Sequence, residues 1–171
     1  MLSKLSKIHQ KIDQFTESLG KAISWFTVLM VLIMVSIVLL RYGFNIGWIA
    51  MQESVLYLHA FVFMLGCSYT LKHNGHVRVD IFYRRFSIKK QAWVNLLGCI
   101  FLLFPVTIFI SVMSFDYITS SWSVMEGSRE AGGLPGVFIL KSLIPLLSLT
   151  LIIQAISEIL KSVEILLGHK N

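Results

Sequence analysis

The side chain best placed for chemistry in an apolar environment is a single histidine. His59 is the one residue of the run 54–71 that can carry a charge near neutral pH. A histidine there can ligate a haem, relay protons, or make a hydrogen bond or partner contact that packs helices together. A haem held by two histidines needs a second one at similar depth, but His73 and His76 lie beyond the polar end of the run. We therefore favour the packing role, with the haem and proton-relay roles as alternatives.

Motifs for catalysis and metal binding are missing from the sequence. The two cysteines, Cys67 and Cys99, lie in different apolar runs and are interpreted as packing residues, not as a disulfide or zinc ligands. There is no GxGxxG, phosphate-binding loop, HExxH or GxSxG motif. We therefore expect no enzymatic activity and no cofactor on this chain.

One polar cluster follows the run 54–71. His76, Arg78 and Asp80 alternate there with two valines. One interpretation is a basic loop that only sets the orientation of the chain in a membrane. The other is a polar network of these three side chains that fixes the angle of the next helix.

A second polar cluster precedes the last apolar run. Glu126, Ser128, Arg129 and Glu130 come just before the Gly-Gly-Leu-Pro segment 132–135. The proline of that segment suits the first turn of a helix.

The elements that position these clusters follow from composition. The chain has 171 residues, of which 56% are hydrophobic and 14% charged. Such values exclude a disordered chain, a collagen-like repeat and a disulfide scaffold, and they disfavour a soluble domain. The net charge of +6 is then interpreted as a report on membrane orientation and not on nucleic-acid binding.

Apolar runs long enough to cross a membrane occur four times, since a helix needs about 20 residues for the hydrocarbon core. They cover residues 22–40, 54–71, 91–115 and about 134–157. Pro105 predicts a kink in the third. Lys141 lies in the fourth, near enough to its end for the ammonium group to reach the polar interface. We expect one all-α integral membrane domain over residues 1–171.

The segment 1–20 carries an amphipathic helical pattern. Its apolar residues recur every three or four positions, at Leu2, Leu5, Ile8, Ile12, Phe15 and Leu19. The pattern predicts an interfacial helix on the anionic inner leaflet or, as an equal alternative, a helix packed on its own bundle or on a partner. A cleavable signal peptide is not expected, since the following run ends at Arg41 without a small-residue cleavage site.

Orientation follows from the distribution of Lys and Arg. Twelve fall in the N-terminal segment, the loop between the second and third runs, and the C-terminal tail, against three on the other side. Because cytoplasmic segments carry the excess of positive charge, both termini are predicted to be cytoplasmic.

Taken in order, these features resemble the small, DctQ-like membrane subunit of TRAP (tripartite ATP-independent periplasmic) transporters. The matching residues are Arg41 and Tyr42, Trp48, Glu53, Gly66, the segment 76–80, Glu126, Ser128, the segment 132–135 and Lys141. Many members carry a pair of acidic residues after the tryptophan, whereas Gln52 precedes Glu53 here, so Glu53 alone carries over. The resemblance covers about residues 22–157.

The resemblance implies a multi-pass subunit of a bacterial inner-membrane transporter that takes up organic acids. Its partners would be a large membrane subunit carrying the substrate and Na⁺ sites, a periplasmic binding protein and the lipid bilayer, with no nucleic acid. The candidate structural and assembly residues are Arg41, Trp48, Glu53, His76, Arg78, Asp80 and Lys141. The candidate contacts to the binding protein are Glu126, Ser128, Arg129 and Glu130.

Two other classes stay open at this point. One is the membrane anchor, or cytochrome b-like subunit, of a respiratory complex. The other is a small exporter that works as a homodimer. Such exporters generally rely on a carboxylate within the membrane, but none of the four runs contains a central Asp or Glu.

Overall fold

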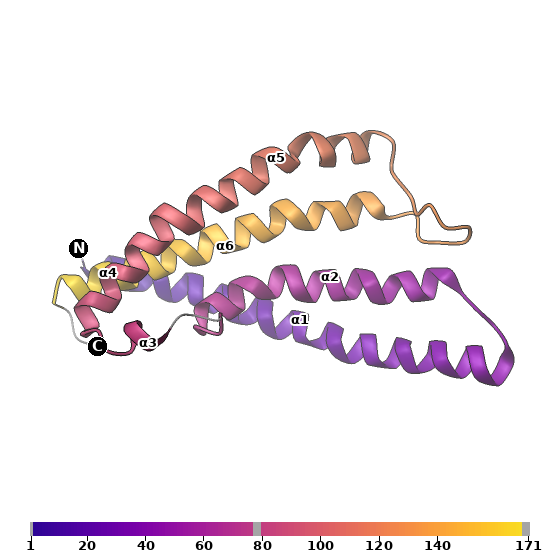
Figure 1. Ribbon diagram of the computed structural model, residues 1–171, viewed down its shortest axis with the longest axis horizontal. Coiled ribbons are helices and arrows are strands. Elements are labelled where there is room, and N and C mark those ends of the chain that lie inside the picture. Colours follow the sequence, from indigo (N-terminus) through magenta and orange to yellow (C-terminus); the bar gives the residue numbers. More distant parts are fainter. Residues whose placement is uncertain (1, 77–79, 169–171) are drawn as a thin grey trace.

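The computed structural model describes residues 2–76 and 80–168, with the side chains of 5–76 and 81–168. Every regular element in these residues is helical (Figure 1). The elements are α1 (Leu2–Phe44), α2 (Ile49–Lys72), α3 (Asp80–Tyr83), α4 (Ile88–Gly98), the π-helical turn η1 (Cys99–Leu103), α5 (Phe104–Ser123) and α6 (Val137–Leu166).

The helices form an elongated bundle around α6. This helix packs against α1, α2, α4 and α5, while α2 also packs along α1. Toward the end away from the termini, Figure 1 shows α6 between α5 on one side and α2 and α1 on the other. α1 begins and α6 ends at one end of the bundle, which we call the termini end. The α1–α2 connection 45–48 and the α5–α6 loop 124–136 lie at the opposite end, which we call the loop end.

Four helices are long and apolar enough to cross a membrane, as the sequence predicts. They are Leu5–Phe44, Ile49–Lys72, the continuous rod Ile88–Ser123 formed by α4, η1 and α5, and Val137–Leu166. Each is longer than the apolar run that predicted it, but the fourth begins at Val137, three residues after the predicted start. The apolar runs underestimate how far the helices extend, because the helices continue into polar residues.

The N-terminal segment is not a separate interfacial helix. α1 runs for 43 residues without a break, so the segment 1–20 belongs, from Leu2 onward, to the helix that also contains the first span. At ~1.5 Å per residue its length is about 65 Å, roughly twice the ~30 Å hydrocarbon core. A helix that continues the axis of a span does not lie flat on a membrane surface. The alternative interpretation, packing on its own bundle, is the one that the structure has.

The irregularity expected at Pro105 takes the form of a π-helical turn. η1 covers the five residues immediately before Phe104 and the proline. A proline removes one backbone donor and crowds the preceding turn, and a wider turn accommodates that locally. Thr107 donates a hydrogen bond to the carbonyl oxygens of Leu103 and Phe104, at 2.8 and 3.0 Å, beside this turn. By contrast, Pro145 lies inside α6 without ending it.

The interior of the bundle is small and largely polar. Among the described side chains, the buried residues of α6 include Ser148, Gln154 and Ser157, each 0% exposed. Large apolar side chains point outward instead, as at Leu39, Phe63 and Phe109. Small and polar residues let helices approach closely and bond to one another, while lipid serves as the solvent for the apolar surface. This inverted pattern agrees with a membrane-embedded bundle.

Candidate functional site

At the loop end, a carboxylate near the start of α2 holds the α5–α6 loop. Glu53 accepts a hydrogen bond from the hydroxyl of Ser128 and another from the backbone N–H of Leu134, at 2.6 Å. The partners lie 75 and 81 residues further along the chain. The loop itself adds a hydrogen bond from the N–H of Glu130 to Ser128 Oγ, at 3.1 Å. One side chain therefore joins two points of the loop to α2.

Two glycines allow this close approach. A Cβ atom at Gly133 would collide with the side chain of Ser128 and lie 2.8 Å from Glu53 Oε1. The preceding Gly132 has φ of +79°, a conformation that residues with a side chain rarely adopt. The Gly-Gly-Leu-Pro segment is thus required by the shape of the loop around Glu53.

A second carboxylate ties the same loop to α5 and α6. Glu126 accepts hydrogen bonds from the hydroxyl of Ser121, at 2.6 Å, and from the ammonium group of Lys141. That ammonium group also lies 3.8 Å from the centroid of the Tyr117 ring, a cation–π geometry. The ion pair with Lys141, followed by the Ser121 hydrogen bond, lowers the pKa of Glu126 below its usual 4.5. Lys141 therefore has a partner inside the protein and does not reach for the interface.

We call Glu53, Ser121, Glu126, Ser128 and Lys141 the loop clamp. Four of these five residues were singled out from the sequence, and the structure brings them together. Ser121 is the member that sequence reasoning missed, because a serine in a helix gives no signal of its own.

The side chains of the other residues singled out at the loop end form no hydrogen bond to the clamp among the described residues. Arg129 and Glu130 are exposed on the loop surface. Arg41 and Trp48 are exposed near the α1–α2 connection, and neither side chain forms a hydrogen bond or ion pair within the part of the chain that the structure describes.

The cluster 76–80 is placed only in part. His76 is exposed on the connection after α2. Arg78 and the side chain of Asp80 lie outside the described residues, so the polar network predicted for these three stays a prediction.

His59 occupies an outward face of α2. It is exposed, its ring stacks on that of Phe63 with centroids 6.4 Å apart, and it makes no hydrogen bond to the described residues. The structure therefore places the side chain where lipid or a partner would contact it, and not between helices of this chain.

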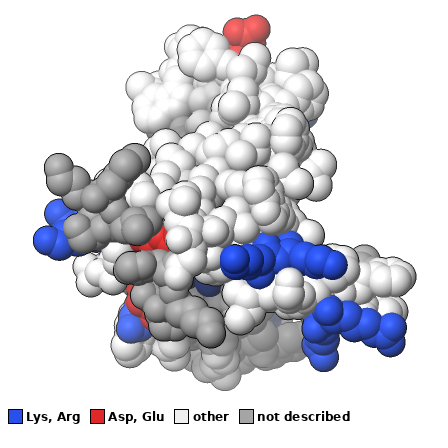
Figure 2. Space-filling model, turned by 90° about the vertical axis from the view of Figure 1, so that its left-hand side faces the viewer, with Lys and Arg blue, Asp and Glu red and all other residues white. Residues whose placement is uncertain are grey.

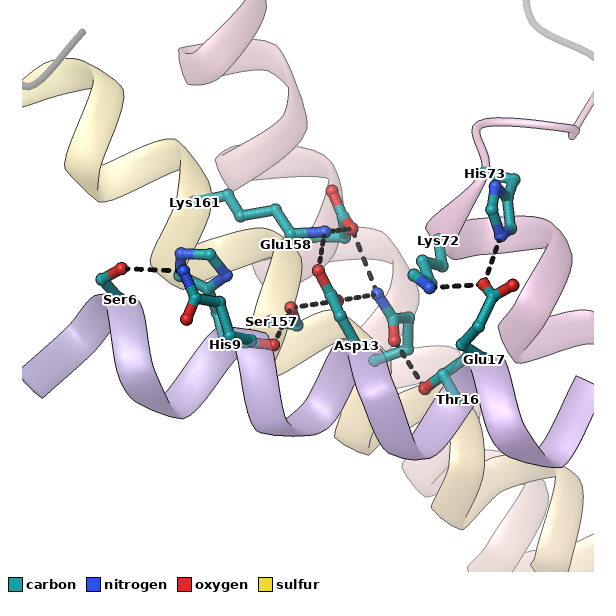
Figure 3. Close-up of polar contacts among 12 residues, drawn as sticks. Ser6, His9, Asp13, Thr16, Glu17, Lys72, His73, Ser157, Glu158 and Lys161 are labelled. Atoms are coloured by element: carbon teal, nitrogen blue, oxygen red, sulfur yellow. Dashed lines mark hydrogen bonds and ion pairs between the residues drawn. The ribbon is translucent and has the colours of Figure 1, made fainter. Parts of the chain in front are cut away.

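A polar interface that the sequence analysis did not anticipate joins α1 to α6 at the termini end (Figure 3). Asp13 accepts hydrogen bonds from Ser157, at 2.7 Å, and from Gln154, at 3.1 Å, and it pairs with Lys161 at 2.9 Å. Thr16 donates a hydrogen bond of 2.7 Å to Gln154.

Two further pairs extend this interface along α1. His9 lies 3.2 Å from Glu164, and both are buried, with His9 Nδ1 and Glu164 Oε1 lacking a hydrogen-bond partner among the described atoms. Further along, Glu17 contacts Lys72 at 2.6 Å and His73 at 2.9 Å, which ties α1 to the end of α2. We call the residues His9, Asp13, Thr16, Gln154, Ser157, Lys161 and Glu164 the α1–α6 polar interface.

The sequence contains a signal for this interface. His9, Asp13 and Thr16 follow one another at helical spacing, on the face beside the apolar stripe of the segment 1–20. A matching polar stripe occurs on α6, at Gln154, Ser157, Lys161 and Glu164. The polar faces of the two helices meet, and the apolar residues Ile8 and Phe15 stay about half exposed.

These arrangements hold helices and a loop in place. Within the described residues, no group of three or more His, Cys, Asp or Glu side chains is placed to hold a metal ion. The carboxylates of Asp13, Glu53 and Glu126 have hydroxyl, amide or ammonium partners, and Glu164 has the imidazole of His9.

Comparison with known proteins gives one match. The family model described as "Tripartite ATP-independent periplasmic transporters, DctQ component" matches residues 30–164. No curated protein and no solved structure matches the chain. The matched region contains all four loop-clamp positions that the sequence resemblance had singled out.

Proposed function

The chain belongs to the DctQ family, the small permease components of TRAP transporters, and on that premise we propose that it is the fixed scaffold of a three-part secondary transporter. The proposal rests on one observation, which is where the polar side chains of this chain find their partners. At both ends of the bundle they bond helices and loops of this chain to one another, while many large apolar side chains of the four long helices face outward.

Rigidity is what a scaffold needs. The α1–α6 polar interface and the Glu17 contact lock three helices at the termini end, and the loop clamp locks the other end. Hydrogen bonds to charged groups each contribute about 1.5–3 kcal/mol. A mobile transport domain can do work across a membrane only if its counterpart keeps its position in the bilayer, and four apolar helices offer wide lipid contact for that purpose.

The transport site itself is assigned to the partner. We propose that a large membrane subunit holds the substrate and the Na⁺ ions, and that the substrate is an organic acid delivered by a periplasmic binding protein. Membership of the DctQ component family supports this division of labour. Na⁺ coupling, the organic acid and the bacterial inner membrane are inferred from the family resemblance. This chain is proposed to carry neither catalytic residue nor cofactor.

The loop end is the proposed contact for the binding protein. Arg129 and Glu130 present charge outward from a loop that the clamp holds in one conformation. Glu126 and Ser128, by contrast, point into the clamp. We therefore divide the four predicted contact residues into two that touch the partner and two that shape the loop.

Co-purification tests the subunit role. Tagged protein is extracted from native membranes in mild detergent, and the proteins that accompany it are identified by mass spectrometry. A large multi-span subunit in a fixed ratio is the expected result. Recovery of this chain alone as a stable homo-oligomer would contradict the scaffold role and favour the exporter class, and an absorbing haem in the pure protein would favour the respiratory class.

The loop contact needs a separate experiment. The double variant Arg129→Glu/Glu130→Lys inverts both outward charges and replaces no residue of the clamp. We expect it to weaken binding of the binding protein to the purified complex while the complex assembles in normal yield. Lys7→Glu/Lys11→Glu, which changes exposed charges at the termini end, is the matched control. Unchanged affinity of the binding protein for the complex with the loop variant would show that the loop is not part of the docking surface.

A further inference from the structure

A groove at the termini end has no occupant among the residues that the structure describes. It lies between the end of α2, α3, α6 and the rod formed by α4, η1 and α5, and its volume is about 650 Å³. α2 contributes Leu71 and α6 contributes Glu158, while α3, the segment after it and the rod supply the rest of the wall. The volume falls within the ~300–1,000 Å³ range of sites for small molecules.

The deep part of the groove is apolar and open to the side of the bundle. Leu102, Leu103 and Val106 line it on η1 and α5, and Phe82 and Phe86 line it beside α3. Leu102 and Phe82 keep more than 60% of their surface exposed. Because the rod is one of the helices able to cross the membrane, this opening faces hydrocarbon. Glu158 does not present a free charge there, since Lys161 lies 2.8 Å from it.

The polar end of the groove is basic. Arg84 and Arg85 stand between the lining residues Tyr83 and Phe86, and Lys89 and Lys90 lie about one turn before the lining residue Val94. Arg85, Lys89 and Lys90 are exposed, and Asp80, the first residue of α3, is the one acidic residue of the segment 80–98. Figure 2 shows Lys and Arg side chains on the termini end of the molecule, which faces the viewer. A positive rim therefore borders an apolar channel.

We propose that this groove binds an anionic glycerophospholipid. An acyl chain lies along Leu102, Leu103 and Val106, and the phosphate group lies against Arg85, Lys89 and Lys90. Basic pockets between membrane helices attract anionic lipid headgroups in this way, through charge near the surface and hydrocarbon at depth. The complementarity selects against a zwitterionic lipid, whose amine would oppose the cations.

Two glycines make the proposal testable without disturbing the helices. A Cβ atom at Gly98, which lines the groove, meets no atom within 4 Å, and the same is true at Gly66 in α2, outside the groove. Gly98→Leu therefore fills the groove, and Gly66→Leu is the matched control. A leucine also raises helix propensity equally at both sites. Lys89→Gln/Lys90→Gln removes charge from the rim, and Lys7→Gln/Lys11→Gln removes the same charge elsewhere on the termini end.

The experiment measures lipid binding by the full chain. Delipidated protein in detergent is titrated with phosphatidylglycerol or phosphatidylcholine, bound lipid is counted by native mass spectrometry, and thermal unfolding is followed by circular dichroism. We expect phosphatidylglycerol alone to bind and to raise the Tm. Gly98→Leu should abolish both effects, and Gly66→Leu should keep them. Lys89→Gln/Lys90→Gln should weaken binding by about fivefold for each cation removed.

Several results would overturn the proposal. Equal binding of the two lipids would show that the protein does not select lipids by charge. Normal binding by Gly98→Leu would show that lipid does not bind in the groove. Equal loss in the two lysine variants indicates attraction to the surface at large. Lipid held by the isolated chain but displaced in the complex with the large subunit indicates that a partner helix occupies the groove. If Gly98→Leu does not fold, the surface variant Lys89→Gln/Lys90→Gln still tests whether the basic rim binds the lipid phosphate.

Discussion

At the scale of single residues, Glu53 shows how one side chain shapes a loop far away in sequence. Its two oxygen atoms take different donors, a hydroxyl and a backbone N–H. Both donors belong to the α5–α6 loop, whose glycines leave room for the carboxylate. The loop conformation therefore depends on a residue of α2.

Glu53→Ala is expected to loosen the loop 124–136. It removes an acceptor that serves Ser128 and Leu134, so both donors lose their charge-assisted hydrogen bond to α2. Hydrogen exchange measured by mass spectrometry should become faster in the loop and stay unchanged in α1. Glu53→Gln, which keeps one acceptor oxygen, should give a smaller effect. Equal protection in all three proteins would show that the clamp does not hold the loop.

Glu126 gives the loop a dependence on pH. Its pKa in the folded protein lies below the 4.5 of the free group because Lys141 and Ser121 stabilise the carboxylate. The folded loop therefore binds fewer protons, and the stabilisation is complete above pH 4.5 and is lost as the pH falls through the lower folded value.

The test uses the fluorescence of Trp122, which donates a hydrogen bond to Ser142 at 2.8 Å and packs against Phe138. In a variant that keeps Trp122 as its sole tryptophan, the emission should change as the pH falls below 4.5. The same variant with Glu126→Gln should already show the altered emission at neutral pH and respond little to acid. An identical acid response in both would assign the transition to another group.

At the scale of elements, α1 and α6 are joined by polar groups instead of apolar packing. Gln154 is fully buried and bonds Thr16, Asp13 and Glu158 at once. A single side chain thus connects the two helices and one further position of α6.

Gln154→Leu is expected to destabilise the bundle. The leucine has nearly the same size but leaves Thr16 without its acceptor and removes one donor from Asp13, and a buried group left unsatisfied costs about 1–3 kcal/mol. The free energy of unfolding in detergent, followed by circular dichroism, should fall by about that amount. Leu149→Ala, on an outward face of α6, should change it by less than about 0.5 kcal/mol. An equal change in both variants would mean that the polar interface contributes no stability.

At the scale of the whole molecule, the two ends of the bundle differ in charge and in proposed function. The termini end carries most of the Lys and Arg, and the loop end carries the clamp. The predicted orientation, with both termini in the cytoplasm, places the proposed lipid groove at the inner leaflet and the clamped loop outside.

Cysteine labelling in intact cells tests this orientation. Cys67 and Cys99 are first changed to serine, and a cysteine is then introduced by Lys7→Cys or by Glu130→Cys, both at exposed positions. A membrane-impermeant maleimide should label the Glu130→Cys protein in spheroplasts and the Lys7→Cys protein only after the membrane is opened. The opposite pattern would invert the topology and move the groove to the outer leaflet.

The sequence by itself determined the class of the molecule. Four apolar runs, the family resemblance and the lack of catalytic motifs depend on composition and local order, which no folding step changes. The residues Glu53, Glu126, Ser128 and Lys141 were also singled out from the sequence, through its resemblance to the DctQ-like family.

The tertiary structure alone decided which polar groups meet. Asp13 pairs with residues more than 140 positions away, and Glu53 with a loop more than 70 positions away, so the partners depend on the register of helices that local patterns do not fix. The sequence also did not determine which face of α1 turns toward α6. An apolar stripe predicts an inward face, yet Ile8 and Phe15 stay about half exposed and the neighbouring polar stripe forms the contact between α1 and α6.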